Sequence, residues 1–247
     1  MNPLIKVLEA APAQPTAGDI AVMIIMLLFS ALIGYFLGSI NTAVIYSHLR
    51  YKKDIRDFGS GNAGMTNMLR TFGKKAAIIT LAGDLLKTVV AVLFAQVVAF
   101  LLGFLAPNLA SAEYLNFSAY CAALFAVTGH CYPIYYKMRG GKGVASAAAA
   151  IATLSPVTFL ICFLVFALIV WGTKYVSLAS VVTVMIYPVV LNRVDGPGIS
   201  NIFAMLIAAL VVFRHKENIK RLWNGNENKI SFGSKKEKKD GKGNSEK

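Results

Sequence analysis

The sequence predicts an all-α integral membrane protein: a polytopic bundle of seven transmembrane helices with its active-site loops on the cytoplasmic side. Of the 247 residues, 56% are hydrophobic and only 15% are charged, whereas about 25% of the residues of soluble domains are charged. The apolar residues are collected in long runs, and a membrane-spanning helix needs about 20 of them. This composition excludes a disordered chain. The three cysteines lack a C-x-x-C spacing, so they are predicted to be buried apolar side chains rather than zinc ligands or disulfides: Cys121, Cys131 and Cys162.

The apolar runs predict the helices in chain order. The first run, residues 20–36, continues into GSINTAVIYSH without a cleavage site, which predicts a retained helix rather than a signal peptide. The next two runs cover 76–105 and about 114–136, and the segment between them contains no Lys or Arg and is expected to face outward. The remaining runs are 144–171, which is broken at Ser155-Pro156, then 176–191, and 199–213.

The charge pattern predicts the topology. Most of the basic residues behind the net charge of +13 lie in residues 49–75, residues 137–142 and the tail from Arg214. The positive-inside rule places all three in the cytoplasm, where they also attract anionic lipid. The N-terminus is then outside and the C-terminus inside. If Lys174 shares the cytoplasmic side, residues 144–171 either cross twice, which gives seven helices, or re-enter, which gives five helices and a hairpin.

The domain organisation is simple. Residues 1–232 are predicted to form a single membrane-embedded domain, and the basic, low-complexity residues 233–247 a disordered cytoplasmic tail.

The first segment that the membrane does not explain is DFGSGNAGMTNMLRTFGKK, residues 57–75. It contains a formal G-x-G-x-x-G, but no buried strand precedes it, which argues against a dinucleotide site. Glycines let backbone amides converge on an anion, and Arg70 is suited to bidentate contact with phosphate. The segment is therefore an anion-binding candidate, with an ordinary glycine-rich loop as the alternative.

Two further segments have related features. In residues 129–146, Arg139-Gly140-Gly141-Lys142-Gly143 precedes a helix, a combination that suits phosphate or a plain turn. In residues 213–229, His215 and Asn218 lie three apart where the last membrane helix emerges. They can face the other two segments, or the segment can be a solvated interfacial helix.

Several polar residues fall within predicted helices. Asp84 and Lys87, three apart, are either functional groups or a structural ion pair. His130 is either an acid/base or a hydrogen-bonded structural residue. Ser177 and Ser180 either line the bundle or pack between helices.

The motifs exclude several chemistries. The sequence shows no metal-binding cluster, no G-x-S-x-G, and no aspartate five residues after any histidine, the dyad of common glycerolipid acyltransferases. What remains can bind two phosphorylated compounds beside lipid. One rival is a transporter of a phosphorylated organic anion, but the predicted external segments 106–116 and 192–198 have only Arg193 as a basic residue. Another rival is a lipid-binding scaffold that uses the tail.

Three motifs in fixed order carry a family resemblance. GSGNAGMTNMLRTFGKK, GHCYPIYYKMRGGKGVAS and RHKENIKRLWNGNENK resemble the bacterial acyl-phosphate:glycerol-3-phosphate acyltransferase family, and GSINTA resembles its first-helix motif. The resemblance implies an inner-membrane enzyme of phospholipid biosynthesis. It would transfer a fatty acyl group from acyl phosphate to the 1-hydroxyl of glycerol 3-phosphate, releasing lysophosphatidic acid and phosphate. No metal or other cofactor and no nucleic acid are implied, and the soluble enzyme that forms acyl phosphate is a candidate partner.

The resemblance also implies roles for individual residues. The proton of the attacking hydroxyl would pass to a substrate phosphate oxygen or to His215. The chain departs from the family pattern at Asn41, Thr88 and Arg139. The implied catalytic residues are Ser60, Arg70, Lys142, His215 and Asn218, and the implied substrate- and phosphate-binding residues are Gly59, Gly61, Asn62, Gly64, Thr66, Asn67, Gly140, Gly141, Gly143 and Ser177.

Overall fold

A computed structural model describes residues 16–105 and 112–230, and its regular elements there are helices. The predictions for the disordered tail, 233–247, and for the segment before residue 16 lie outside the described residues. The α-helices are α2 (Ala17–Gly38), α3 (Thr42–Tyr51), α4 (Met65–Phe72), α5 (Lys74–Gly103), α6 (Ala112–Cys131), α7 (Val144–Leu154), α8 (Pro156–Thr173), α9 (Val176–Val194), α10 (Ile199–Arg214) and α11 (Lys216–Trp223), and 3₁₀ turns occur at Ile55–Asp57 and Ile134–Tyr136.

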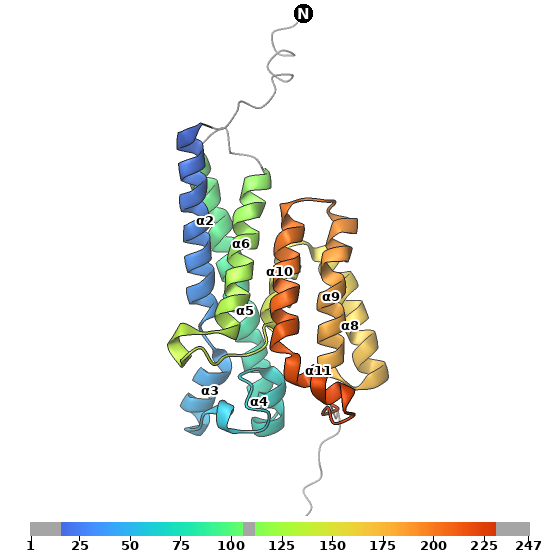
Figure 1. The fold of residues 1–247 in the computed structure, drawn as a ribbon. Coiled ribbons are helices and arrows are strands. Elements are labelled where there is room, and N and C mark those ends of the chain that lie inside the picture. Colours follow the sequence, from blue (N-terminus) through green and yellow to red (C-terminus); the bar gives the residue numbers. More distant parts are fainter. Residues whose placement is uncertain (1–15, 106–111, 231–247) are drawn as a thin grey trace, which may run out of the picture.

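The long helices form two groups (Figure 1). One group is α2, α5 and α6, and the other is α8, α9 and α10. The short helix α7 joins them, because it contacts α5 and α6 on one side and α8 on the other. Glycines bring α2 close to α6: a Cβ at Gly34 or Gly38 would overlap the backbone of Ala122 or Ala126, respectively. Such small-residue contacts are typical of helices packed in a membrane.

The bundle has the dimensions of a membrane protein. Four described helical segments are long and apolar enough to span a bilayer: α2 with α3, α5, α8 and α9. The pair α10 and α11, bent by 59°, makes a fifth if it counts as one span. Helix α7 has 11 residues, or about 16 Å at 1.5 Å per residue, roughly half the hydrocarbon thickness. The all-helical membrane bundle is confirmed, and the count of seven crossings stays a prediction.

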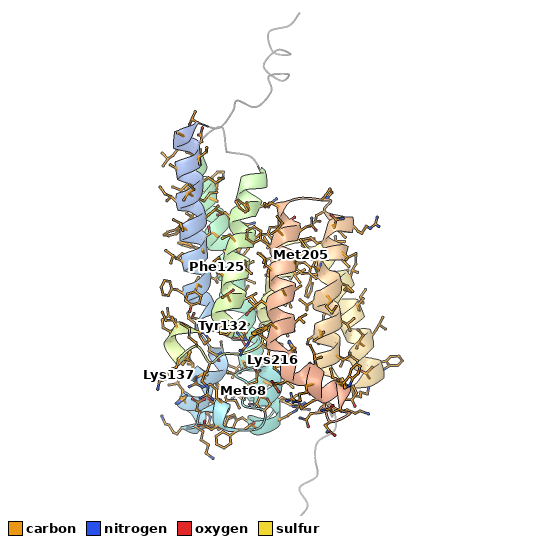
Figure 2. The ribbon with its side chains drawn as sticks, viewed as in Figure 1. Met68, Phe125, Tyr132, Lys137, Met205 and Lys216 are labelled. Atoms are coloured by element: carbon orange, nitrogen blue, oxygen red, sulfur yellow. The ribbon has the colours of Figure 1, made fainter. Side chains whose placement is uncertain are left out.

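The sides of the bundle are apolar and its interior is built from small residues. Leu28 is 61% exposed, Leu164 54% and Met205 54%, and Figure 2 labels Phe125 and Met205 along the body of the bundle. Buried alanines are frequent on α5, α6 and α7. Lipid, rather than water, is the solvent that accepts such a surface without a large hydrophobic cost.

Two helix boundaries differ from the sequence prediction. The run predicted to reach residue 136 ends as a helix at Cys131, because Pro133 cannot donate a backbone hydrogen bond and residues 134–136 form a 3₁₀ turn. The first run ends at Gly38, and a separate helix, α3, begins after Asn41, whose side-chain oxygen accepts from the Val44 amide at 3.1 Å.

The basic segments gather at one end of the bundle. Figure 1 shows α3, α4 and α11 together at that end, and in Figure 2 Lys137 and Lys216 lie toward it. The carbonyl of Lys174 accepts from the Ile230 amide at 2.9 Å, so the end of α8 lies at the same end as the segment after α11. The chain therefore leaves this end in α7 and returns to it in α8. Which side of the membrane this end faces stays a prediction.

Candidate functional site

A cavity of about 590 Å³ lies between the two groups of helices and brings the three sequence motifs together. Its apolar wall comes mainly from α7, α8 and α9, and includes Ala148, Phe159 and Phe163. The glycines at 59, 61, 140 and 141 were also predicted to bind substrate, but they do not line the cavity. The predicted residues that do line it are Ser60, Asn62, Gly64, Thr66, Asn67, Arg70, Lys142, Gly143, Ser177, His215 and Asn218.

The loop before α4 is held from inside by Asn67. The buried side-chain nitrogen of Asn67 donates to the carbonyls of Ile55, Phe58 and Asn62, and its oxygen accepts from the Ser60 amide at 3.0 Å. The loop therefore uses all the polar atoms of the Asn67 side chain, which makes Asn67 a loop-shaping residue.

Two positive φ angles complete this loop. The φ values of Gly59 and Gly61 are 59° and 69°, a region that glycine enters without strain. The resulting turn presents Ser60 at the cavity, and Arg70 follows from α4.

The glycine-rich loop before α7 is fixed on two sides. The Gly141 amide donates to the carbonyl of His130 at 3.1 Å. From the other side, the guanidinium of Arg214 donates to the carbonyls of Gly140 and Gly141 at 3.3 and 3.1 Å. Lys142 then reaches into the cavity at the N-terminus of α7, where the helix dipole also favours an anion.

A hydrogen-bond network connects Lys142 with the last motif. The Lys142 ammonium donates to Oδ1 of Asn218 at 2.6 Å, and Nδ2 of Asn218 donates to Oε1 of Glu227 at 2.8 Å. Ser177 donates to the same Glu227 oxygen at 3.0 Å, and Nε of Arg221 donates to Oε2 at 2.8 Å. The network therefore fixes Asn218 and Ser177 beside Lys142.

Sequence reasoning missed Glu227, Arg221 and Asn228, which also line the cavity. The carbonyl of Asn228 accepts from Arg70 at 3.4 Å, so this segment also contacts the first motif. A weak signal was present, because Glu227 is one of only two acids, with Glu217, in the basic segment 213–229.

The cavity end is electropositive. Burial lowers the pKa of Lys142 to about 8; Glu227 opposes this, while Arg221, Arg214 and Arg70 lower the pKa further. Burial alone would raise the pKa of Glu227, but hydrogen bonds from Arg221, Asn218 and Ser177 outweigh it, so the pKa is lowered and the carboxylate stays ionised. One carboxylate among several cations leaves a site that favours an added anion.

His215 is buried and has one nitrogen available. Its Nδ1 lies 2.7 Å from the carbonyl oxygen of Val211. A carbonyl can only accept, so this contact places the proton on Nδ1 and leaves Nε2 as an acceptor. The geometry is compatible with a base, since His215 lines the cavity.

The other ionisable candidates also come together. Asp84 and Lys87 form an ion pair at 3.0 Å, and His130 lies beside them. Asp84 and His130 both line the cavity. Within the described ranges, no group of three His, Cys, Asp or Glu side chains is placed to hold a metal ion.

Fold and site together define an integral membrane protein with a cation-lined polar pocket that continues into an apolar one, the arrangement that suits a phosphorylated, lipid-like molecule. The family model described as glycerol-3-phosphate acyltransferase matches residues 28–225. The chain belongs to this family, which confirms the resemblance seen in the three motifs.

Individual relatives agree with the assignment. A glycerol-3-phosphate acyltransferase of Clostridioides difficile is 43% identical over 84% of this chain and 96% of its own length. That of Syntrophotalea carbinolica is 41% identical over 81% and 95%. The crystal structure of PlsY (YgiH), an integral membrane glycerol 3-phosphate acyltransferase, in its glycerol 3-phosphate form has a TM-score of 0.71 at 34% identity, and covers 83% of this chain and 96% of that one. Its lysophosphatidic acid form has a TM-score of 0.68 at 33% identity, with 83% and 95% coverage.

Proposed function

We propose that this protein transfers a fatty acyl group from acyl phosphate to the 1-hydroxyl of glycerol 3-phosphate, in the cytoplasmic membrane of a bacterium. The products are lysophosphatidic acid and inorganic phosphate. The observation that carries the proposal is the Lys142–Asn218–Glu227 network at the polar end of a cavity whose other wall is apolar. Phosphate groups suit the polar end, and an acyl chain suits the apolar wall.

The chemistry requires little beyond positioning. The 1-hydroxyl oxygen forms a bond to the acyl carbonyl carbon, the bond from that carbon to the phosphate oxygen breaks, and phosphate leaves. An acyl phosphate is already activated, so no enzyme nucleophile is needed. The hydroxyl proton passes to a phosphate oxygen of the substrate, and Nε2 of His215 is the alternative acceptor in the cavity.

The cationic and hydroxyl side chains then have distinct roles. Lys142 and Arg70 hold the two phosphorylated substrates and stabilise the charge that develops on the leaving phosphate. Ser60 supplies a hydroxyl donor, Ser177 donates to Glu227, and Asn218 orients Lys142. Holding both substrates in register converts a bimolecular encounter into a unimolecular step.

The direct test uses purified protein with palmitoyl phosphate and glycerol 3-phosphate, and measures released phosphate and lysophosphatidic acid together. We expect equal amounts of both, dependent on glycerol 3-phosphate. Phosphate alone would mean hydrolysis and a wrong acceptor. Neither product, from protein shown to be folded, would favour the transporter, which phosphate-driven uptake into liposomes would then detect.

Activity is expected to fall above pH 8. The pKa of Lys142 is lowered to about 8. Its amine is therefore protonated and positively charged below that pH, and it loses the proton and the charge above it. Since kcat/KM reports ionisations of the free enzyme, it should fall about tenfold per pH unit above about 8. Measuring kcat/KM from pH 7 to 10 checks this. In Lys142→Arg the guanidinium stays charged, so any activity that remains should not show this fall; an identical fall would assign it to another group.

Glu227→Gln is expected to lower kcat/KM about tenfold and to lower the thermal midpoint. The substitution keeps the size of the side chain but removes the charge that accepts from Ser177, Asn218 and Arg221, and hydrogen bonds to charged groups contribute about 1.5–3 kcal/mol each. Glu217→Gln, at an exposed position of α11, is the matched control. Equal losses in both variants would show that the net charge of the segment from residue 216 to residue 230, rather than the network, is responsible.

A further inference from the structure

We propose that Asp84, Lys87 and His130 form a buried positioning cluster that sets the place of Lys142 in the cavity. The proposal rests on the proposed function for the role of Lys142. The three side chains come from the middle of the chain, outside the loops that carry the other site residues: two are on α5 and one is on the last turn of α6. They are 1%, 7% and 3% exposed, respectively.

The Lys87 ammonium is the centre of the cluster. Its nitrogen lies 2.7 Å from the carbonyl oxygen of Ile40, 3.0 Å from Oδ1 of Asp84 and 2.9 Å from Nδ1 of His130. An ammonium has three N–H donors: Lys87 donates to the Ile40 carbonyl and to Nδ1 of His130, and it forms an ion pair with Asp84. Asp84 balances the charge of the ammonium. Because Ile40 lies between α2 and α3, the contacts of Lys87 also connect this break to α5 and to His130 on α6.

This arrangement fixes the ring of His130. Because Lys87 donates to Nδ1, the proton of the neutral imidazole is on Nε2. The ring cannot flip without losing the contact to the ammonium. Orientation of a histidine ring through one nitrogen determines where the other nitrogen points.

The ring of His130 meets the glycine-rich loop directly. A Cβ at Gly141 would overlap Nε2 of His130, and one at Gly140 would overlap the carbonyl oxygen of His130. The same carbonyl accepts from the Gly141 amide at 3.1 Å. His130 therefore contacts the loop through both its ring and its backbone, one residue before Lys142.

The geometry favours positioning over proton transfer. His130 lines the cavity, but its Nδ1 accepts from Lys87 and its Nε2 carries the proton, so the neutral ring has no free acceptor nitrogen for a substrate proton. Arg214 holds the opposite side of the loop through the carbonyls of Gly140 and Gly141. The loop is held between these two contacts, so a shift of the His130 ring moves the loop, and Lys142 with it.

A double-mutant cycle tests the link to Lys142, because residues that act through one another are not additive. We expect His130→Gln to lower kcat/KM for acyl transfer at least tenfold in the wild-type background, and less than twofold in the Lys142→Ala background. The control is Ser118→Ala, which removes a buried contact of 2.6 Å to Ser30 between α2 and α6 and should leave kcat/KM within twofold. An undiminished loss in the Lys142→Ala background, or no loss in the wild-type background, would overturn the proposal.

A second measurement does not depend on turnover. The three native cysteines are buried, but Cys162 lines the same cavity. In a Cys162→Ala background, Lys142→Cys therefore places the single accessible thiol among the described residues at the loop. A sulfonated methanethiosulfonate should modify this introduced thiol at a rate that His130→Gln changes at least fivefold and Ser118→Ala leaves within twofold. An unchanged rate in the His130→Gln variant contradicts the proposal.

The two proposals can fail separately. Absence of acyl transfer in folded wild-type protein would reject the proposed function, and the labelling rates would still decide on the cluster. If His130→Gln does not fold, Asp84→Asn, which removes the countercharge of Lys87 at constant size, replaces it in both measurements with the same expected results.

Discussion

Lys142→Ala is expected to lower turnover by about 10² to 10³, because removal of one preorganised charge at a reacting centre costs on the order of 3 kcal/mol. The ammonium of Lys142 lies in the cavity, pairs with Asn218 at 2.6 Å, and is flanked by further cations that would bind the same anion. Steady-state release of phosphate and lysophosphatidic acid by purified variant in detergent or lipid is the measurement.

Lys137→Ala is the matched control. Lys137 precedes the same glycine-rich loop, is exposed and does not line the cavity, so its loss should change turnover less than twofold. The thermal midpoint of Lys142→Ala should stay close to that of wild type, since a half-buried ammonium stabilises the fold little. Near-normal turnover of folded Lys142→Ala would reject the assignment.

The membrane fold was predictable because its cause is local. Runs such as 76–105 and 199–213 identify helices α5 and α10 within a few residues, since a bilayer requires both apolar side chains and satisfied backbone groups. The predicted helix boundaries were wrong where a single residue ends or begins a helix: α6 ends before Pro133, and α3 begins after Asn41. A hydropathy run does not register such single-residue effects.

The motif residues were predictable as a set, but their division of labour was not. Ser60, Lys142 and Asn218 do line one cavity. Asn67, however, holds its own loop, and Gly141 packs on His130. Which polar atoms are free for a ligand depends on hydrogen bonds between segments that lie far apart in the sequence.

The contacts that sequence reasoning missed are long-range. Glu227 accepts a hydrogen bond from Ser177, which lies 50 residues earlier in the chain. It also accepts from the nearer residues Asn218 and Arg221. His130 and Lys87, 43 residues apart, meet only because α5 packs on α6. The spacing of Asp84 and Lys87 did predict a pair, since residues three apart share a helix face.

Arg70→Ala is expected to cost a similar factor, about 10² to 10³ in kcat/KM, for a different reason. Arg70 is exposed on α4, lines the cavity, and donates to the carbonyl of Asn228 at 3.4 Å. This long hydrogen bond leaves most of the guanidinium available for a bidentate contact with phosphate. Arg70→Lys should recover only part of the loss, because lysine restores the charge without the planar pair of donors.

Arg139→Ala distinguishes a direct contact between Arg70 and phosphate from a long-range electrostatic effect of its charge. Arg139 carries the same charge at an exposed position near the cavity but does not line it. If Arg70 acts by direct contact, Arg139→Ala should change kcat/KM less than threefold, and the Arg70→Ala loss should persist at 0.5 M salt. If Arg70 acts through the electrostatic field, both variants should lose activity together, and salt should reduce the difference from wild type, because exposed charges are screened over about 10 Å at 0.1 M and over less at higher salt. Direct contact therefore requires both a small effect of Arg139→Ala and an Arg70→Ala loss that persists at high salt.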